Sequence, residues 1–400
     1  MKLFDHEEIV SEGLTKLLIP RMDLYRRPDG SVEPAWMPVF YNPEAVISRD
    51  LTVLFLKAIM GKSNFFFVDL LSGTGIRGLR IAVEVGGYGI LNDVDPRAYH
   101  YIRRNIALNN LEDRVEAYNN EANALLNTLV FTGVFVDYID VDPYGSPVPF
   151  LDSIFKPIGK EAYIGVTATD VAPLACTHPR KALTRYWNYC VKVDFEKEYA
   201  VRLLIANTAM RASALEVELE PLLALAHRHF IRVFFKARRG VSKAYSTISK
   251  CTGYIWYCQN TLERGFVKTP EEARELACAD GSKPITLGKT WICEIGDEGT
   301  AQRMLQAASS MQWLRPGTVN LLEVIKEEIP IKMPYFRLDR LCSLLKTNMP
   351  SINTLISELK ARGISSSRTH MDPRGVKVHA KYEELVDTVL QLTKYLGYGR

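Results

Sequence analysis

Short apolar runs alternate with longer amphipathic stretches over the first two thirds of the chain. Continuous apolar runs that end in turn residues are typical of buried strands, and apolar residues repeated every three or four positions are typical of helices. The predicted strands lie at residues 64–71, 88–94, 114–122, 133–142, 162–169 and 230–237. The predicted helices lie at residues 43–61, 76–86, 95–110 and 195–228. Strands that alternate with helices predict an α/β fold with a parallel, doubly wound sheet.

The last third of the chain follows a different pattern. The alternation fades after about residue 260, and the polar, turn-rich stretch 269–284 marks a boundary. Two short amphipathic segments, 335–346 and 351–363, flank the turn TNMPS and precede SSSRTHMDPRGVKVHA. Two short helices across such a turn, followed by a hairpin, are typical of a helix-turn-helix with a β-wing. We therefore predict a first domain at 1–260, with an N-terminal extension, and a smaller α+β C-terminal domain at 261–400 with a winged-helix-like tail.

A glycine-rich loop follows the first predicted strand. Residues 73–78 read GTGIRG and fit the pattern G-x-G-x-x-G between a strand and a helix. Gly73 and Gly75 let the backbone turn tightly and approach a ligand, and the helix that follows offers free N–H groups. Asp93 lies at the end of the next strand, where a carboxylate can bind a ribose diol. A plain structural turn also needs glycines, but the strand, the helix and Asp93 together favour a nucleotide-type cofactor.

The charge near this loop bears on which cofactor binds. The glycine pattern formally matches the fingerprint of nicotinamide dinucleotide enzymes. Asp69, however, lies four residues before Gly73, inside the strand. A carboxylate there suits the cationic amino-acid end of S-adenosylmethionine and would repel a pyrophosphate. The sequence favours the methyl donor, and the dinucleotide remains the alternative.

Three aspartates occur in the fourth predicted strand, where residues 134–145 read VFVDYIDVDPYG. Side chains at i and i+2 share one face of a strand, so Asp140 and Asp142 should lie on one side and Asp137 on the other. This separation disfavours a metal site made of three carboxylates. Active sites of open α/β sheets form at the carboxyl ends of strands, where Asp142 is expected.

The residues at this strand end suit chemistry on an amine of a nucleic-acid base. Such an amine is a weak nucleophile, because its lone pair is delocalised into the ring. The Asp142 carboxylate can accept one N–H and later the proton, and the Pro143 carbonyl can accept a second N–H. Tyr144 can stack on the base. A turn with aspartate as a helix cap is the structural alternative, but the donor-binding loop earlier in the chain favours amine methylation.

Composition and charge add few constraints. Of the 400 residues 47% are hydrophobic and 24% charged, and the net charge of +4 is too small to indicate a polyanionic partner by itself. No apolar run approaches the length of a membrane span, and we expect no signal region at the N-terminus. The seven cysteines form no C-x-x-C pair, which predicts neither a zinc signature nor a disulfide framework. We therefore expect a reducing, cytoplasmic setting.

Several motifs together identify a family. They read VFYNPEAVISRDL, DLLSGTGIRGLR, NDVDP, DVDPYGSP, GVTATDVAPL, VFFKARRG and SSSRTHMDPRGVKVHA. With them the chain resembles the tRNA (guanine-26-N2) dimethyltransferases of archaea and eukaryotes along nearly its whole length. The resemblance implies a Rossmann-like S-adenosylmethionine-dependent methyltransferase domain and a C-terminal tRNA-binding domain. It implies transfer of one or two methyl groups to the exocyclic N2 amine of guanine 26, giving N2-methyl- and N2,N2-dimethylguanosine.

The resemblance also implies roles for single residues. By motif match the donor contacts would be Arg49, Arg77, Asp93, Glu121 and Ala122. Phe40 and Tyr144 would sandwich the guanine, and Asp142 would accept the proton. The family usually has aspartate where this chain has Glu121, which puts the adenine-side contact in doubt. It more often has phenylalanine where this chain has Tyr144, and a tyrosine ring should stack similarly.

Many family members also carry two C-x-x-C pairs that bind zinc in the C-terminal half. The matching stretches here read CQNT from Cys258 and CADG from Cys278, so half of each pair is missing. Cys251 and Cys293 could complete four thiolates, but at unusual spacings. We expect no metal and expect these cysteines to be small buried residues.

A target base inside a folded RNA must be extracted before chemistry, which requires a grip on the RNA backbone. Basic residues cluster after the sixth strand and in the tail, and a solvated surface run is the alternative for each cluster. The candidate RNA contacts are Lys236, Arg238, Arg239, Lys243, Arg368, His370, Arg374 and Lys377, with Arg180, Lys181 and Arg185 as weaker ones. The expected partner is tRNA, and we expect a monomer without a membrane association.

Three other functions stay open from sequence. Asp-Pro-Tyr suits the amine of a DNA adenine equally well. A nicotinamide dehydrogenase is disfavoured by Asp69 and by the motif that begins at Asp142. A non-catalytic RNA-binding protein that kept the fold is disfavoured by the intact Asp142 and glycine loop.

Overall fold

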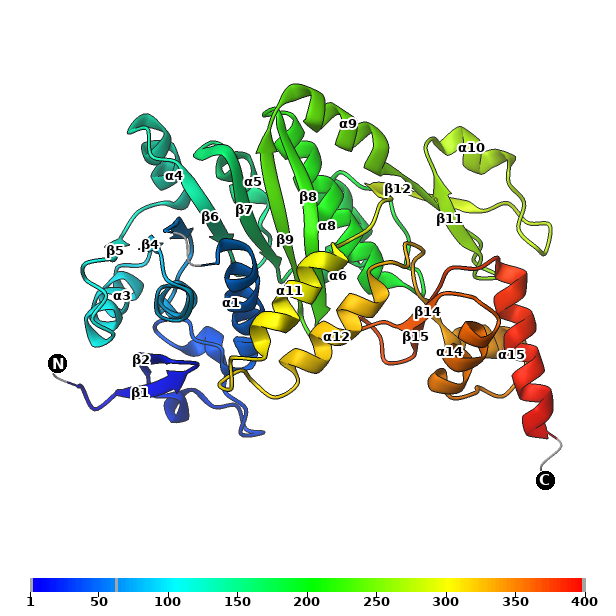
Figure 1. Ribbon diagram of the computed structural model, residues 1–400, viewed down its shortest axis with the longest axis horizontal. Coiled ribbons are helices and arrows are strands. Elements are labelled where there is room, and N and C mark those ends of the chain that lie inside the picture. Colours follow the sequence, from blue (N-terminus) through cyan, green and yellow to red (C-terminus); the bar gives the residue numbers. More distant parts are fainter. Residues whose placement is uncertain (1–2, 62–63, 398–400) are drawn as a thin grey trace. The chain divides into compact units, whose positions relative to one another are not determined.

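A seven-stranded sheet carries the elements that alternate along the sequence. The computed structural model describes residues 3–61 and 64–397, and the strand order is β5-β4-β3-β6-β7-β9-β8 (Figure 1). The strands are β3 (Phe66–Asp69), β4 (Tyr88–Asn92), β5 (Val115–Tyr118), β6 (Val136–Val141), β7 (Ile158–Ala168), β8 (Val217–His227) and β9 (Phe230–Arg239). The pairs β3–β4, β3–β6, β4–β5 and β6–β7 are parallel. The predicted α/β fold with a largely parallel sheet is confirmed.

The helices around these strands are α1 (Val46–Met60), α2 (Ile76–Arg80), α3 (Pro96–Leu108), α4 (Ala122–Phe131) and α5 (Val148–Ile154), and α2 continues as the π-helical turn η4 (Ile81–Val85). Three of them, α1 to α3, lie where the sequence predicts, and α4 and α5 were not predicted. The Asp95 side chain accepts the N–H of Arg97 and caps α3, with Pro96 at the first helical position. Buried residues such as Leu54, Phe67 and Ile139 form the interior of this region.

One predicted helix is wrong in part. The stretch 195–228 was expected to be helical throughout, but α8 (Glu196–Ser213) ends early and strand β8 follows. Between them Glu216 adopts a left-handed conformation with φ of 60°. From Val217 the burial pattern alternates buried and half-buried, which is the period of a strand rather than of a helix. His227 therefore ends a strand and not a helix, and His229 lies in the turn that follows.

The chain divides into two compact units. Unit 1 comprises the described parts of 1–167, 234–240 and 302–320, and unit 2 comprises 168–233, 241–301 and the described part of 321–400. Each unit is thus assembled from separated stretches of chain. The functional division at residue 260 stays a prediction.

Unit 1 includes an N-terminal hairpin that the sequence pattern did not reveal. Its strands are β1 (Glu7–Glu12) and β2 (Thr15–Pro20). Glu12, buried at the end of β1, accepts two hydrogen bonds from the Arg49 guanidinium at 2.6 Å each and one from Arg80 at 3.1 Å. Arg80 also pairs with Asp50 at 2.7 Å. A buried charge is stable only when it is paired and hydrogen-bonded in this way.

The segment 302–320 closes unit 1 from a distant part of the sequence. The Trp313 indole N–H donates to Glu84 at 2.7 Å. The Arg315 backbone N–H and the Thr318 hydroxyl both donate to Asp50 Oδ2, at 2.8 and 2.9 Å. These bonds supply donors to carboxylates that would otherwise be buried without enough partners.

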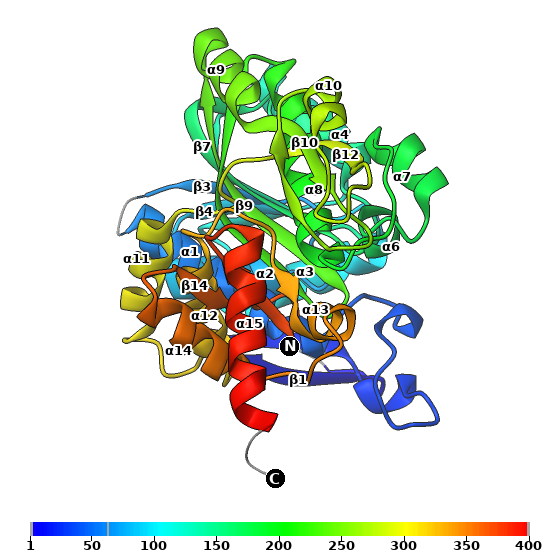
Figure 2. The same cartoon turned by 90° about the vertical axis from the view of Figure 1, so that its right-hand side faces the viewer.

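Unit 2 ends in the predicted winged helix. Helices α13 (Leu338–Leu344) and α14 (Ile352–Ala361) flank the turn, and the antiparallel strands β14 (Ser366–Arg368) and β15 (Gly375–Val378) form the wing. The short strand β13 (Phe336–Arg337) pairs with β15. Helix α14 packs on β14 and on the last helix, α15 (Tyr382–Gly397) (Figure 2). The predicted winged-helix-like tail is confirmed.

The other elements fill the sequence between β7 and the winged helix. They are α6 (Val171–Leu174), α7 (Pro179–Tyr186), α9 (Val241–Cys251), β10 (Thr252–Tyr257), β11 (Arg264–Val267), α10 (Pro270–Glu275), β12 (Ile285–Trp291), α11 (Glu298–Ala308) and α12 (Thr318–Glu328). Strands β10, β11 and β12 form an antiparallel sheet with β10 in the middle. Among the described residues, no helix has both the length and the apolar character that crossing a bilayer requires.

Candidate active site

The glycine loop between β3 and α2 has the geometry that its sequence requires. Gly73 and Gly75 both have positive φ angles, of 54° and 87°. A Cβ atom at Gly73 would come within 3.0 Å of the Phe40 carbonyl oxygen, so only glycine fits there without displacing that segment. The loop therefore brings the Phe40 backbone close to the start of α2.

Asp93 is fixed beside this loop at the end of β4. Its Oδ2 accepts the Gly73 N–H at 2.8 Å, and its Oδ1 accepts the Asp95 N–H at 3.0 Å. Burial raises the pKa of Asp93, although these backbone N–H groups favour the charged form. The carboxylate is thus oriented and half-buried where the sequence places a ribose contact.

Asn92 holds the ends of three neighbouring strands together, and sequence reasoning missed it. Its side-chain amide donates to the Leu70 carbonyl at 3.1 Å and to the Asn120 carbonyl at 3.0 Å, and its oxygen accepts the Asn120 N–H at 3.1 Å. Leu70 follows β3 and Asn120 follows β5. An asparagine inside an otherwise apolar strand was the available signal, because a buried amide needs partners.

Glu121 and Ala122 follow β5 at the same edge of the sheet. The Glu121 carboxylate caps α4, accepting the Ala124 N–H at 2.8 Å and the Asn123 side-chain amide at 3.0 Å. These donors outweigh burial and lower the pKa of Glu121. Its side chain is exposed and Ala122 is buried.

Asp69 lies buried under the loop. Its Oδ2 accepts the Gly78 N–H at 3.0 Å. Burial raises the pKa of Asp69 to about 7, and the charge of Asp140 adds to this effect. The proton on this carboxyl therefore exchanges near neutral pH.

Arg77, which the family resemblance implies as a donor contact, is held by protein groups, and the donor contact stays a prediction. Its buried guanidinium forms an ion pair with Asp142, lies 3.3 Å from Asp140 Oδ1 through Nε, and donates to the Thr52 hydroxyl at 2.8 Å. Burial alone would lower the pKa of Arg77, but the carboxylates of Asp140 and Asp142 raise it. Arg77 therefore stays charged and anchors both aspartates.

The three aspartates of β6 separate as the alternation predicts. Asp140 is fully buried and accepts the Tyr138 hydroxyl at 2.5 Å. Asp137 lies exposed on the other side, where it accepts the Phe66 N–H at 2.8 Å. Asp137 is thus separated from Asp140 and Asp142, which share the Arg77 guanidinium.

Asp142, Pro143 and Tyr144 follow β6, at the carboxyl end of the sheet. The Asp142 side chain is 28% exposed and Pro143 is buried. Tyr144 is 85% exposed and Phe40 is 46% exposed, and their ring centroids lie 6.4 Å apart with planes at 70°. Two aromatic faces thus stand exposed beside a reachable carboxylate.

Arg49 lies on α1, nine residues after Phe40, and is buried. Besides the two bonds to Glu12, it donates to the Asn42 carbonyl at 3.0 Å, and its guanidinium lies 5.5 Å from the Tyr41 ring centroid. Its described partners are therefore Glu12 of β1 and groups of the segment that carries Phe40.

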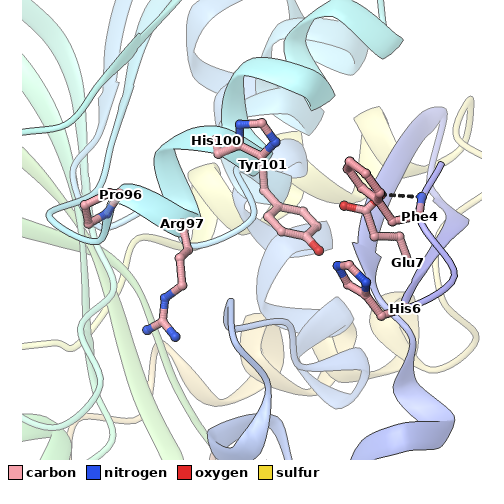
Figure 3. A pocket seen from close by; sticks show the side chains of 7 residues that line it. All are labelled: Phe4, His6, Glu7, Pro96, Arg97, His100 and Tyr101. Atoms are coloured by element: carbon pink, nitrogen blue, oxygen red, sulfur yellow. Dashed lines mark hydrogen bonds between the residues drawn. The ribbon is translucent and has the colours of Figure 1, made fainter. Parts of the chain in front are cut away.

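A pocket of about 370 Å³ opens between the N-terminal segment and α3, and none of the predicted site residues lines it (Figure 3). The Phe4 and His6 rings stack at 5.7 Å. The lining residues are Phe4, His6, Glu7, Pro96, Arg97, His100 and Tyr101.

The predicted RNA contacts after β9 differ in their exposure and in whether protein groups already pair with them. Lys243 is exposed on α9, and no ion pair holds it among the described residues. Lys236 pairs with Glu161 at 2.9 Å, and Arg238 is half-buried. Arg239 donates to the carbonyls of Phe155, Lys156 and Ile158.

The candidates in the tail also differ. Arg368 donates to Asn353 at 3.0 Å, and Arg374 is half-exposed and 3.1 Å from Asp339. Lys377 is fully buried, with its Nζ 3.0 Å from Glu198, so it has no surface to offer a phosphate. The expectation that Lys377 contacts RNA is corrected accordingly, because its ammonium serves a buried ion pair.

His370 is buried as well. Its Nε2 accepts the Ala226 N–H at 3.0 Å, and its Nδ1 pairs with Glu328.

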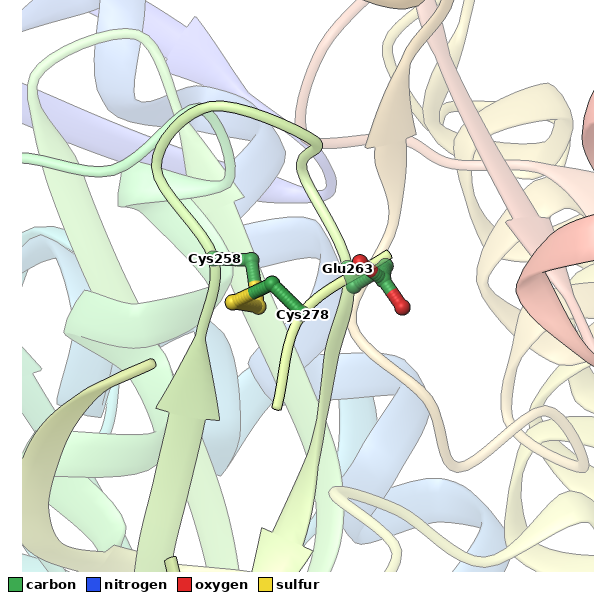
Figure 4. Close-up of side chains that lie close together, drawn as sticks. All are labelled: Cys258, Glu263 and Cys278. Carbon is green, nitrogen blue, oxygen red and sulfur yellow. A yellow bond between two sulfur atoms is a disulfide. The ribbon is translucent and has the colours of Figure 1, made fainter. Parts of the chain in front are cut away.

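The cysteines correct a second expectation. Six of them form disulfides, which the scattered spacing did not predict: Cys176–Cys190, Cys251–Cys293 and Cys258–Cys278. Glu263 lies beside the third bridge, and its carboxylate and the two sulfurs are within 4.8 Å of one another (Figure 4). Cys342 is a buried free thiol. The expectation of no metal stays a prediction.

Comparisons with known proteins agree on one family. Residues 25–390 match the family model described as N2,N2-dimethylguanosine tRNA methyltransferase. A tRNA (guanine(26)-N(2))-dimethyltransferase of Sulfolobus acidocaldarius is 33% identical over 96% of this chain and 97% of its own. A tRNA (guanine(26)-N(2)/guanine(27)-N(2))-dimethyltransferase of Aquifex aeolicus is 31% identical over 96% of both. The structure of Trm1 from Pyrococcus horikoshii with S-adenosyl-L-methionine superposes with a TM-score of 0.82 at 28% identity, covering 96% of this chain and 99% of that one.

Proposed function

The chain belongs to the N2,N2-dimethylguanosine tRNA methyltransferase family, and we propose that Asp142 is the residue with which it performs the family's reaction. The reaction transfers methyl groups from S-adenosylmethionine to the exocyclic N2 amine of guanine 26 in tRNA. It gives N2-methylguanosine and N2,N2-dimethylguanosine. One observation carries the proposal: a partly exposed carboxylate ends β6 between an anchoring arginine and two exposed rings.

The groups around the glycine loop fit the methyl donor. The carboxyl groups of Asp69 and Asp93 bond the loop backbone, and that of Glu121 caps α4 after β5. The nearby Arg77 is occupied by Asp140 and Asp142. These carboxyl groups suit a ligand with a cationic amino acid and a ribose, and their negative charge would repel a pyrophosphate. When bound, S-adenosylmethionine supplies an electrophilic methyl group on its sulfonium.

The position of each predicted donor-binding residue suggests which group of S-adenosylmethionine it would contact. Asp93 would hold the ribose hydroxyls, because its carboxylate is already oriented by two backbone N–H groups. Glu121 and Ala122 would border the adenine after β5. Asp69, with Gly73 and Gly75, would lie near the amino-acid end. Arg49 would act on the donor from its buried position beside Phe40.

The target amine would be handled by the residues after β6. The Asp142 carboxylate accepts one N–H of the guanine amine and the Pro143 carbonyl accepts the other, which favours lone-pair character on nitrogen. After methyl transfer the nitrogen carries a positive charge, and its proton passes to Asp142. The 28% exposure of that side chain gives the proton a route to solvent. Removal of the proton restores a neutral amine, which a second round can methylate.

Phe40 and Tyr144 would hold the guanine between them. Their rings now meet edge-on with centroids 6.4 Å apart. A base can enter only if the rings turn toward parallel, and the 85% exposure of Tyr144 leaves it free to do so. Base–aromatic stacking contributes about 1–3 kcal/mol per base, which offsets part of the cost of extracting the guanine from the RNA.

The RNA backbone would be held by cationic side chains that the fold leaves accessible. Lys243 and Arg368 are the best placed, with Lys236, Arg238, Arg239 and Arg374 as further contacts. We assign the C-terminal part, 261–400, to tRNA binding, and residues 1–260 to methyl transfer. The enzyme would act as a monomer in the cytoplasm, where tRNA is processed.

The decisive experiment identifies the product. The protein is incubated with tritiated S-adenosylmethionine and an unmodified tRNA transcript, and the digested nucleosides are separated. N2-methyl- and N2,N2-dimethylguanosine should form, and a matched transcript with adenosine at position 26 should remain unlabelled. Methyladenosine, or equal labelling of the matched transcript, would contradict the proposed target.

A pair of charge-reversal variants tests whether Lys243 contacts the RNA backbone. Lys243→Glu should weaken tRNA binding and reduce its dependence on salt, because each lost phosphate contact lowers the salt slope by about one. Glu275→Lys, an exposed change of opposite sign on α10, provides a control for net charge. An unchanged affinity and salt slope for Lys243→Glu would remove that residue from the RNA contacts.

A further inference from the structure

The loop closed by the Cys176–Cys190 disulfide carries a net positive charge, of which, among the described residues, only Arg185 is compensated, by Asp170 at 2.6 Å. Between Val171 and Val193 the chain has basic residues but no aspartate or glutamate. Arg180, Lys181 and Lys192 are exposed, and no ion pair engages them within the described structure. A stretch of this kind produces a local positive potential even though the net charge of the chain is small.

Two large aromatic side chains stand out from the same loop. Trp187 is 62% exposed and Tyr189 is 74% exposed. Trp187 follows α7 with φ of 53°, and the Arg211 guanidinium lies 4.4 Å from its ring centroid. A cation over one face of an indole fixes the ring and leaves the other face available.

The backbone that displays these rings is held in several places. The disulfide joins the two ends of the loop. Between the rings, buried Asn188 donates to the Lys289 carbonyl at 2.9 Å and accepts the Tyr199 hydroxyl at 2.7 Å. Tyr189 also forms a β-bridge with Gly288. The rings are thus exposed although the chain around them is fixed, which lowers the entropy cost of binding a ligand.

We propose that the Cys176–Cys190 loop is a stacking platform for an unpaired nucleotide of the tRNA. Trp187 and Tyr189 stack on the base, and Arg180, Lys181 and Lys192 bind the adjoining phosphates. The combination of exposed rings with unpaired cations is how proteins hold single-stranded nucleic acid without reading its sequence. The absence of acidic residues favours a polyanion over a protein surface of mixed charge. The identity of the RNA as tRNA rests on the proposed function.

Tryptophan fluorescence tests the stacking directly. An unstructured oligouridylate is added to the full-length protein, and quenching of the indole emission is followed. Quenching should be seen in the unmodified protein, should disappear in Trp187→Phe, and should persist in Trp36→Phe, which removes another exposed indole. Quenching that survives in Trp187→Phe would overturn the assignment of Trp187.

Affinity for tRNA tests the function of the platform. Trp187→Ala and Tyr189→Ala should each raise the Kd for unmodified tRNA about 5-fold or more, since that is the range for loss of one stacked base. Phe131→Ala, which removes an exposed ring on α4, should leave the Kd unchanged. The single-turnover rate at saturating tRNA and the Kd for S-adenosylmethionine should not change in any of them.

A second variant leaves the buried contacts of the loop in place. Arg180→Glu with Lys181→Glu changes two exposed side chains on α7 and should reduce the salt slope of tRNA binding by about two. Wild-type protein that fails to methylate tRNA would refute the proposed function. Wild-type protein that methylates tRNA, together with ring and charge variants that bind it normally, would refute the platform alone and leave the loop to a protein partner.

Discussion

Replacing Asp142 by asparagine should separate chemistry from binding. Asparagine keeps an oxygen that can accept a hydrogen bond but cannot take the proton from the methylated amine. General-base contributions are typically about 10²- to 10⁴-fold, so the single-turnover rate of methyl transfer should fall by that factor. The Kd for S-adenosylmethionine should stay unchanged, because Asp142 pairs with the Arg77 side chain, whereas the loop backbone at Gly73 is held by Asp93.

The cost to stability of this change should be small. The Asp142 side chain is 28% exposed, and Arg77 keeps Asp140 at 3.3 Å and Thr52 at 2.8 Å. A hydrogen bond to a charged group contributes about 1.5–3 kcal/mol when buried, and partial exposure places the loss near 1 kcal/mol. Urea unfolding should therefore show a folded variant that is only slightly less stable.

The same strand supplies the control. Asp137→Asn makes the identical chemical change five residues earlier, where the side chain faces away from Arg77 and accepts the Phe66 N–H. Its rate of methyl transfer should match the wild type. A normal rate for Asp142→Asn, or loss of donor binding in that folded variant, would refute its role as proton acceptor.

Other consequences concern buried charges and sulfur. Burial raises the pKa of Asp69 to about 7 from its ordinary value of 3.8, so the contribution of this group to the free energy of unfolding falls as pH rises from about 3.8 to about 7 and is level above that; Asp69→Asn should flatten this fall, as measured by urea unfolding at several pH values across this window, and an unaltered pH dependence would contradict the shift. Lys377→Met should lower the free energy of unfolding by about 3 kcal/mol, since it leaves Glu198 with fewer partners, and tRNA affinity should be unchanged; weaker tRNA binding at normal stability would restore an RNA role. Thiol titration of unfolded protein should find one free thiol, that of Cys342, and seven would exclude the disulfides. Protein purified without chelator should contain no zinc, because sulfur in the Cys258–Cys278 bridge cannot act as thiolate; one zinc per chain would overturn this.

Periodicity predicted the sheet and the division of the aspartates on β6, because burial on a strand repeats with every second residue. It failed at β8, where the apolar stretch from Leu222 to Ala226 resembled the end of a helix. The alternation from Val217 to Glu220 was the signal that distinguished a strand.

Contacts between residues far apart in sequence were beyond this reasoning. Glu12 precedes Arg49 by 37 residues, and the residues around each of them do not predict that the two will form an ion pair. Disulfide pairing could not be predicted either, because the spacing of cysteines in a sequence does not determine which of them are joined. Lys377 did carry a local clue, because it lies between two valines of a short strand.

The return of residues 302–320 to unit 1 governs when that unit can fold during synthesis. Asp50 is synthesised 268 residues before Thr318, whose hydroxyl donates to it in the folded unit. At ribosomal rates this interval is about 13 to 54 s. Throughout it the carboxylates of Asp50 and Glu84 lack donors that the finished protein supplies. The methyltransferase unit is therefore completed only after most of unit 2 has emerged, and a fragment meant to fold alone would need 302–320 joined to it.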